Sequence, residues 1–308
     1  MTTSGQLSIG QRLKRTVVQI KIHPLLDSLN EAIFLREYLA ACGIDYVDAY
    51  LNPDSIEYQS PDMYKNMDVA VNLFNHAKGS VGIVIDSDLD GACSAAIAYM
   101  LCIENGLEDI RIYSHAGKEH GLSDLASQIA IDELDLLIVP DAGSNDIYQC
   151  EELMCMGIDI IILDHHVIEK SNRYATVVNP YRDDNASNIN TDISGTGVVE
   201  KFAYALGSNQ SFKDLVAVSL ISDICSLRSP ENRKYVYDGL TNPTNPFIKY
   251  CLEHCCNRGV NPEGVAFGIA PLANALARSD DQSTKRLFFD ALIGKIETYI
   301  NDALADVR

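Results

Sequence analysis

The 308-residue sequence contains no tryptophan, and basic side chains are scarce in it. Lysine and arginine together number 24 against 43 aspartates and glutamates, which gives a formal net charge of -19. A broad surface for non-specific binding of nucleic acid or anionic lipid needs clustered lysine and arginine, so this composition argues against one. The acidic excess leaves room for carboxylate metal ligands.

Long apolar runs and a regular cysteine pattern are also missing. No apolar run approaches the roughly 20 residues of a membrane-spanning helix, and the first residues lack the apolar segment of a secretory signal. We therefore expect no membrane partner. Because the nine cysteines also show no regular framework, we expect a reducing, cytoplasmic location. The cluster Cys251, His254, Cys255 and Cys256 has no second pair at zinc-ligand spacing, so helical packing of these thiols is favoured.

Hydrophobic periodicity divides the chain into three segments. Residues 1–79 are predicted to form a helical segment packed on the core, with helical spacing from Leu25 to Leu39. Residues 80–240 alternate short apolar strands with helices, and residues 241–308 are again helical in pattern, including Ser283 to Ala305. With 47% hydrophobic residues, the chain can bury a substantial core.

The segment 80–240 contains four apolar runs that predict buried strands. These are residues 81–85, 110–114 and 134–139, and the Ile-Ile-Ile-Leu run that opens the stretch Ile160 to Val167. Helices of ordinary length separate the runs, which predicts an α/β fold with a mostly parallel sheet flanked by helices. In such folds the ligand site lies beyond the carboxyl ends of the strands.

Ionisable side chains follow three of these strands directly. They are Asp86, Asp88 and Asp90 after the first strand, Asp141 after the third, and Asp164, His165 and His166 after the fourth. Burying such groups unpaired is costly, and a metal ion is the natural compensation. Carboxylates and imidazoles without a thiolate suit manganese or magnesium, and the histidine favours manganese. Two such ions can activate a water and neutralise a phosphate.

Each motif also has a simpler interpretation. Asp164 is equally consistent with a helix N-cap followed by two incidental histidines. The Asp-x-Asp-x-Asp-Gly run resembles the start of an EF-hand calcium loop, but Ile97 stands at its twelfth position and a strand precedes it, which disfavours calcium. A turn that merely caps the following alanine-rich helix is the other alternative.

Taken in order, the motifs resemble those of the DHH phosphoesterase superfamily, and within it the RecJ-type single-strand exonucleases. The resemblance covers roughly residues 82–289. Residues 86–91, 141–143 and 164–166 resemble the first three motifs, 194–198 the glycine-rich turn, and 220–223 the fourth acidic motif. Residues 231–233 and 267–278 are similar to RecJ-type segments. Val84 stands where the pyrophosphatase branches are expected to carry a histidine.

The resemblance implies a phosphodiesterase that cleaves single-stranded DNA, RNA or short oligonucleotides with two divalent ions, manganese preferred over magnesium. Its implied metal ligands are Asp86, Asp88, Asp90, Asp141 as the bridge, His165 and Asp223. His166 would face the scissile phosphate, and Asp164 would fix a histidine tautomer. With Asp141, these two residues form the implied catalytic set.

Further residues are expected to contact substrate. The turn Ser194, Gly195, Thr196 and Gly197 precedes an apolar helix, and free backbone N–H groups there could hold a phosphate; a plain helix start is the alternative. By resemblance, Asn274 and Arg278 grip a neighbouring phosphate, although a structural arginine on a helix face is as reasonable. His120 is expected near the substrate.

The chain also departs from the RecJ pattern. Ala277 stands where glycine usually precedes the arginine, and no Gly-Gly-His segment is present. We therefore expect the second domain of the superfamily and the oligonucleotide-binding fold to be missing, so that a protein partner or homodimer supplies the substrate surface, or the substrate is short. The competing functions are a small-molecule phosphatase, which Val84 disfavours, and a non-catalytic replication or repair scaffold, which the complete set of ligand-competent residues disfavours.

Overall fold

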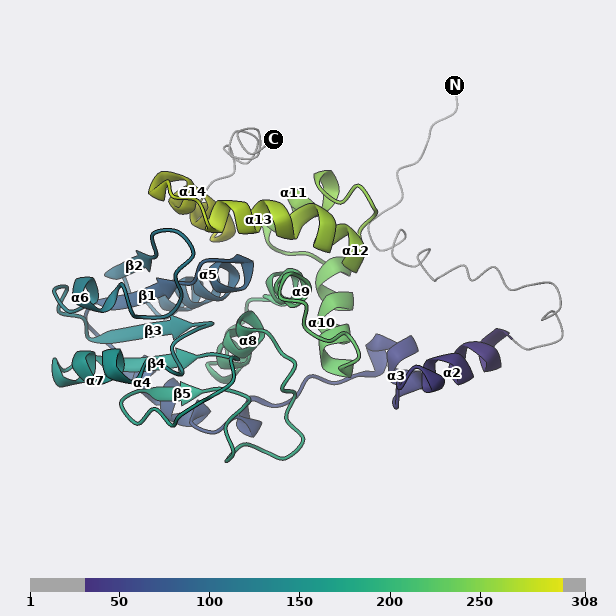
Figure 1. The fold of residues 1–308 in the computed structure, drawn as a ribbon, viewed down its shortest axis with the longest axis horizontal. Helices are drawn as coiled ribbons and strands as arrows, with labels where there is room; N and C mark the ends of the chain where they lie inside the picture. Colours follow the sequence, from purple (N-terminus) through teal and green to yellow (C-terminus); the bar gives the residue numbers. More distant parts are fainter. Residues whose placement is uncertain (1–30, 296–308) are drawn as a thin grey trace, which may run out of the picture.

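The structure, a computed structural model, describes residues 31–295 and is built around one parallel sheet (Figure 1). The strands are β1 (Val81–Ile85), β2 (Ile110–Ser114), β3 (Leu136–Pro140), β4 (Asp159–Leu163) and β5 (Thr176–Val178). They lie in the order β2-β1-β3-β4-β5, and every neighbouring pair is parallel. The predicted fold class is confirmed.

Helices cover both faces of the sheet and form a layer beside it. They are α2 (Glu31–Ala41), α3 (Val47–Leu51), α4 (Met67–His76), α5 (Leu89–Glu104), α6 (Ala126–Ile129), α7 (Ile147–Cys155), α8 (Gly195–Ala205), α9 (Lys213–Ser222), α10 (Pro230–Thr241), α11 (Pro246–His254), α12 (Pro262–Gly264), α13 (Ala270–Ala277) and α14 (Gln282–Leu292). Short 3-10 turns η2 (Pro53–Ser55) and η3 (Pro61–Met63) precede α4, and a π-helical turn η4 (Val265–Ile269) precedes α13.

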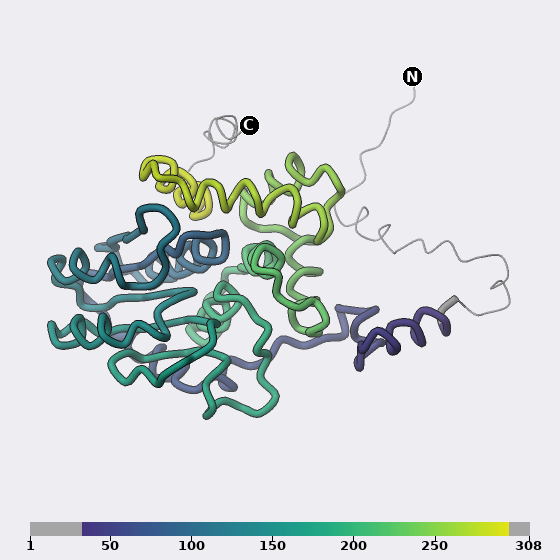
Figure 2. The backbone as a smooth tube through the Cα atoms, in the orientation of Figure 1, coloured from purple at the N-terminus to yellow at the C-terminus, as the bar shows by residue number. Residues whose placement is uncertain are grey.

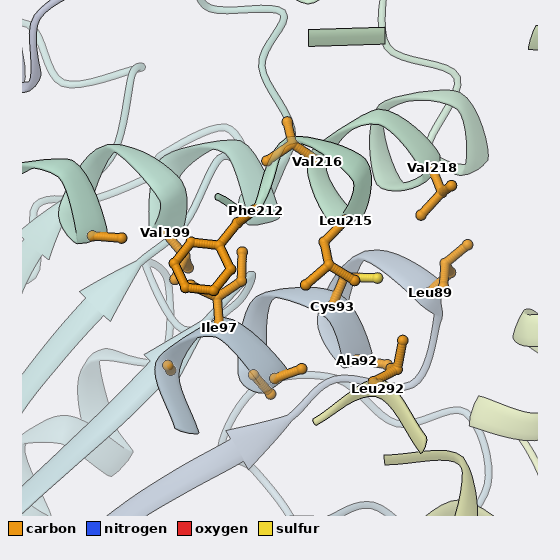
Figure 3. Packing of buried hydrophobic residues seen from close by; sticks show 14 of the residues in the cluster. Leu89, Ala92, Cys93, Ile97, Val199, Phe212, Leu215, Val216, Val218 and Leu292 are labelled. Carbon is orange, nitrogen blue, oxygen red and sulfur yellow. The ribbon is translucent and has the colours of Figure 1, made fainter. Parts of the chain in front are cut away.

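The central strands are apolar on both faces because both faces are covered. The larger core joins one face of the sheet to α4, α5, α8 and the helices that follow. Figure 3 shows part of it, where Cys93 of α5 lies beside Leu215 of α9 and Ile97 of α5 lies beside Phe212. The smaller core joins the other face to α6 and α7. After α10 the chain turns back over α5 through α13 and α14 (Figure 2).

The predicted strands agree with the observed ones to within two residues, with one omission. β5 was not predicted, because its three residues are too few to show a pattern. The predicted helices Leu25 to Leu39 and Ser283 to Ala305 appear in part as α2 and α14. Helix α14 ends at Leu292, earlier than predicted, and residues 293–295 are not helical, while residues 25–30 and 296–305 lie outside the described residues. The predicted boundary at residue 240 falls in the last turn of α10, and the domain division stays a prediction. Within residues 31–295, no helix combines the length and apolar character needed to cross a bilayer.

Candidate metal centre

The predicted ligands gather where the carboxyl ends of the strands meet the starts of α5 and α8 and the end of α9. Asp86 follows β1 and Asp141 follows β3. The sheet pairing continues past the strand ends, since Asp141 N donates to Leu163 O (2.8 Å) and Asp164 N donates to Val178 O (3.1 Å). The arrowheads of β3 and β4 point toward α8 and α9 in Figure 1. The parallel topology thus collects side chains that are far apart in sequence.

Two groups of ligand-competent side chains share Asp141. One consists of Asp86, Asp88 and Asp141, and the other of Asp141, His165 and His166; within each, the potential ligand atoms lie within 4.8 Å of one another. A third group of the same kind joins His165 to Asp223 and Cys225. Sharing of one carboxylate between two groups is the arrangement expected of a bridging ligand.

Asp141 is held in an unfavourable environment. Its backbone φ is 63°, a left-handed conformation that is uncommon outside glycine, and its side chain is buried. Oδ1 has no hydrogen-bond partner. Burial, together with the nearby carboxylates of Asp90, Asp88 and Asp86, raises the pKa of Asp141 well above its usual value. A buried, unpartnered carboxylate among like charges indicates a cation site.

His165 presents a ring nitrogen to this carboxylate. Its Nδ1 donates to Ile193 O at 2.9 Å, which leaves Nε2 as an acceptor. Nε2 lies 3.2 Å from Asp141 Oδ1, 3.6 Å from Asp90 Oδ2 and 3.7 Å from Asp223 Oδ2. The Nε2 lone pair and the carboxylate oxygens are all acceptors, so no hydrogen bond can form between them. A divalent cation between these atoms satisfies all of them.

His166 and Asp164 form a separate pair. Asp164 is buried and its Oδ1 accepts from His166 Nδ1 at 2.8 Å and from the backbone N–H groups of both histidines. Although burial opposes ionisation, these hydrogen bonds hold the pKa of Asp164 below its usual value. The hydrogen bond to Asp164 in turn raises the pKa of His166 to about 9. Asp164 thus orients His166, whereas the carbonyl of Ile193 orients His165.

The glycine-rich turn differs from the prediction that its backbone N–H groups are free. Gly195 N and Thr196 N donate to the two oxygens of Asp90 at 2.9 and 2.8 Å, and the Thr196 hydroxyl also donates to Asp90. Gly197 N donates to Ser194 Oγ, the N-cap of α8. Asp90 occupies the positive end of α8, so these backbone N–H groups are not free in this structure, and contact of the turn with a substrate phosphate stays a prediction.

Glycine at position 195 has a steric reason instead. A Cβ at this position would collide with the Asp141 carboxylate. The start of α8 can therefore lie against the ligand cluster only if residue 195 lacks a side chain. Asp90 remains near His165, but with Ser219 Oγ as a further donor it is tied mainly to protein hydrogen bonds.

Asp86 is flanked by two histidines. His120 Nδ1 lies 2.7 Å from Asp86 Oδ2, which places the predicted substrate-proximal histidine on a metal-ligand candidate. Asp86 Oδ1 has no partner, and burial raises the pKa of this carboxyl group. His115 Nε2, also buried and unpartnered, lies 3.8 Å from Oδ1. Sequence reasoning placed His115 at this edge of the sheet, because it follows the strand 110–114 directly, but assigned it no role.

The two predicted phosphate-binding residues of the C-terminal part differ in freedom. Asn274 Oδ1 accepts from Leu89 N at 2.9 Å and its Nδ2 donates to Ser222 Oγ at 3.3 Å, so this amide joins the start of α5 to the end of α9. One N–H of this amide is therefore engaged inside the protein, and its expected grip on a phosphate stays a prediction. Arg278 is exposed, and its Nε donates to Ser87 O at 3.1 Å, inside the first acidic motif. It stays a candidate for contact with substrate.

Comparison with known proteins agrees with this geometry. Residues 80–222 match the model of the DHH family, N-terminal domain. The chain contains a DHH domain. This DHH domain holds most of the residues just described, from Asp86 to Thr196, and Asp223 follows its last matched residue.

Relatives of the DHH chain are similar over most of its length. YorK of Bacillus subtilis strain 168, named as a single-strand DNA-specific exonuclease, is 29% identical over 79% of this chain and 44% of its own. RecJ of Haemophilus influenzae, a single-stranded-DNA-specific exonuclease, is 27% identical over 85% of this chain and 48% of its own. The chain therefore spans less than half the length of either relative.

A solved structure supports the fold. The crystal structure of an exonuclease RecJ bound to manganese superposes with a TM-score of 0.69, at 22% identity, over 79% of this chain and 65% of the other. At this level of identity the likeness establishes the shared DHH fold.

Proposed function

We propose that this DHH chain is a divalent-metal-dependent phosphodiesterase that hydrolyses single-stranded nucleic acid. One observation carries the proposal: two groups of ligand-competent side chains share Asp141, and buried carboxylate oxygens of Asp86 and Asp141 lack any partner. The two groups that share Asp141 offer carboxylate and imidazole ligands and no thiolate, which fits manganese and magnesium. The names of the relatives, which refer to single-stranded DNA and to bound manganese, support the same substrate and metal.

Bound divalent ions would supply charge neutralisation at the phosphate and an activated water. The residues of the chain prepare the surroundings for this chemistry. Asp86, Asp88, Asp141 and His165 would hold the ions, with Asp223 at the edge. The starts of α5 and α8 fix the cluster, because Asp88 caps α5 and Asp90 accepts from the first N–H groups of α8.

His166 is the residue best suited to face the phosphate. Its Nδ1 is bound to Asp164, and a pKa raised to about 9 keeps the ring protonated at neutral pH. Its side chain is 57% exposed, so Nε2–H can reach a bound molecule. The residue can therefore donate a hydrogen bond to a phosphate oxygen, and a proton to the leaving oxygen. Exposed Arg278, anchored on Ser87 O, adds a positive charge beside the first motif.

The net charge of -19 limits how the substrate is held. A long single strand is usually retained along a positively charged groove, and this chain has few basic residues to form one. We propose that the substrate is short, or that a protein partner or second copy supplies the binding surface.

The test is hydrolysis of a substrate panel by the purified chain with manganese. The panel contains 5'-phosphorylated single-stranded DNA, RNA of the same sequence, a dinucleotide and pyrophosphate. We expect manganese-dependent release of nucleotides from the strands, loss of release with EDTA, and no activity in His165→Ala. The surface variant His76→Ala, whose ring contacts Asn72 O at the other end of the sheet, should match the parent.

Absence of hydrolysis of every member of the panel, with no effect of chelator, would contradict the enzyme assignment. Cleavage of pyrophosphate or the dinucleotide alone would assign the same centre to small-molecule phosphate esters instead of nucleic-acid strands.

A further inference from the structure

The loop after β2 places a buried histidine beside the metal centre. His115 is buried, with 0% of its surface exposed, and two of its polar atoms have hydrogen-bond partners. Its Nδ1 lies 2.7 Å from Asp124 Oδ1, and its backbone carbonyl accepts from Lys285 Nζ at 2.8 Å and from Gln282 Nε2 at 3.2 Å. Asp124 of the β2–α6 loop therefore orients the ring, and α14 fixes the backbone of the same residue.

The hydrogen bond to Asp124 determines which nitrogen can bind a ligand. A carboxylate accepts only, so Nδ1 carries the proton of the neutral ring and Nε2 carries the lone pair. Orientation of a histidine by a carboxylate on one nitrogen while the other faces a cation is the arrangement common to metal-bound histidines. Nε2 of His115 is buried and unpartnered.

The opposing group is the Asp86 carboxylate. Nε2 lies 3.8 Å from Asp86 Oδ1, which also has no partner, whereas Oδ2 is taken by His120. A separation of 3.8 Å is too long for a hydrogen bond. It fits two ligands of one ion, since metal–ligand bonds of about 2.1 Å allow ligand atoms of the same ion to lie up to about 4.2 Å apart.

We propose that His115, oriented by Asp124, is an additional imidazole ligand of the divalent ion at Asp86. This inference rests on the proposed metal centre but not on which bond the protein cleaves. An imidazole at this position favours manganese over magnesium, because magnesium prefers oxygen ligands. The loop after β2 thus sets metal affinity and metal choice at one half of the centre.

The test compares manganese binding by His115→Ala, Asp124→Asn and the control His76→Ala. Binding is measured by calorimetry and by the electron paramagnetic resonance signal of free manganese. We expect His115→Ala to weaken manganese binding about 10–100-fold, with a smaller loss for magnesium, and Asp124→Asn to weaken it less. Electron spin-echo modulation should detect one fewer coordinated imidazole nitrogen in His115→Ala than in the parent.

Manganese affinity within about twofold of the parent in His115→Ala, with an unchanged nitrogen signal, would overturn the proposal. If His115→Ala does not fold, as judged by circular dichroism without metal, Asp124→Asn decides by the same affinity measurement. The two proposals fail separately. If manganese binding depends on His115 but no substrate is hydrolysed, only the nuclease proposal is contradicted. If hydrolysis depends on manganese but His115→Ala binds manganese like the parent, only the assignment of His115 as a ligand is contradicted.

Discussion

Helix α8 carries two buried charged clusters that are built in opposite ways. At its start lies the metal-centre cluster of Asp86, Asp141 and His165. Lys201 lies in the second turn of α8 and contacts a second cluster residue, Glu231, which in turn contacts Asn190; these three residues are called the Lys201 cluster. Both clusters are largely buried, and His165 is their most exposed member, with 12% of its side chain exposed. They differ in whether their polar atoms have partners.

The Lys201 cluster is satisfied within the protein. Lys201 Nζ donates to Gln59 O at 2.7 Å and to Glu231 Oε1, and it lies 5.4 Å from the centre of the Tyr235 ring. Glu231 also accepts from Gln59 N at 2.7 Å and from Asn190 Nδ2 at 3.1 Å. In the metal-centre cluster, Asp86 Oδ1 and Asp141 Oδ1 have no donor. The difference indicates that the Lys201 cluster stabilises the fold and that the metal-centre cluster binds a ligand.

The largest expected effect is that of Asp141→Asn, which removes the shared carboxylate. Hydrolysis should fall on the order of 10³-fold or more, and manganese binding should be lost. The metal-free chain should become more stable by about 1–2 kcal/mol, because a buried charge among like charges is removed. The gain should grow as pH rises, since the raised pKa of Asp141 means that the parent is forced to ionise there.

Denaturant unfolding with and without manganese measures this effect. A variant that keeps its hydrolysis, or one that loses stability without metal at every pH, would show that Asp141 is a structural residue like Glu231.

Glu231→Ala should have the next largest effect, on stability. Removing one partner of a buried pair leaves Lys201 charged and unpaired, which costs about 3–5 kcal/mol of unfolding free energy. The double variant Lys201→Met with Glu231→Leu should lose much less, because no charge is left behind. Urea unfolding of the metal-free proteins measures both. Equal losses in the single and double variants would contradict the role of charge.

Thr196→Val tests whether Asp90, which lies next to the metal-centre cluster, is satisfied within the protein like Glu231. The Thr196 hydroxyl donates to Asp90 Oδ1 at 2.6 Å, so its removal should cost about 1–3 kcal/mol. Thr241→Val is the matched control, since Thr241 Oγ1 is buried without any partner and its loss should be neutral or stabilising. The melting temperature should fall in Thr196→Val and stay unchanged or rise in Thr241→Val, and equal shifts would show that the hydrogen bond to Asp90 contributes nothing.

The smallest expected effect is a pH dependence from His166. Its pKa of about 9 lies above the usual value of about 6.5, so the folded chain holds this proton more tightly than the unfolded chain. The resulting stability is fully present below about pH 6.5 and is lost as pH rises through about 9. Because the ring is more than half exposed, we expect less than about 1 kcal/mol. His166→Gln should flatten the unfolding profile over this range, and His254→Gln should leave it unchanged.

Much of the fold was predictable from local patterns. The strands 81–85 and 110–114 were predicted residue for residue, because branched apolar runs bounded by acidic or glycine residues have few other interpretations. The convergence of Asp86, Asp141 and the 164–166 triplet also followed, since parallel strands present their carboxyl ends at one edge. β5 was missed because it is defined by its pairing with β4 and not by its own sequence.

The sequence by itself determined which segments form strands and which residues meet at the carboxyl edge of the sheet, because hydrophobic periodicity and chain direction are local properties. Tertiary structure alone decided which polar atoms are already occupied. Asp90 and the 195–196 N–H groups satisfy each other across the start of α8, while Asp86, Asp141 and His115 are left facing one another. Hydrogen-bond partners from segments about 100 residues apart leave no periodic signal, so only the packed chain distinguishes a structural carboxylate from a ligand-binding one.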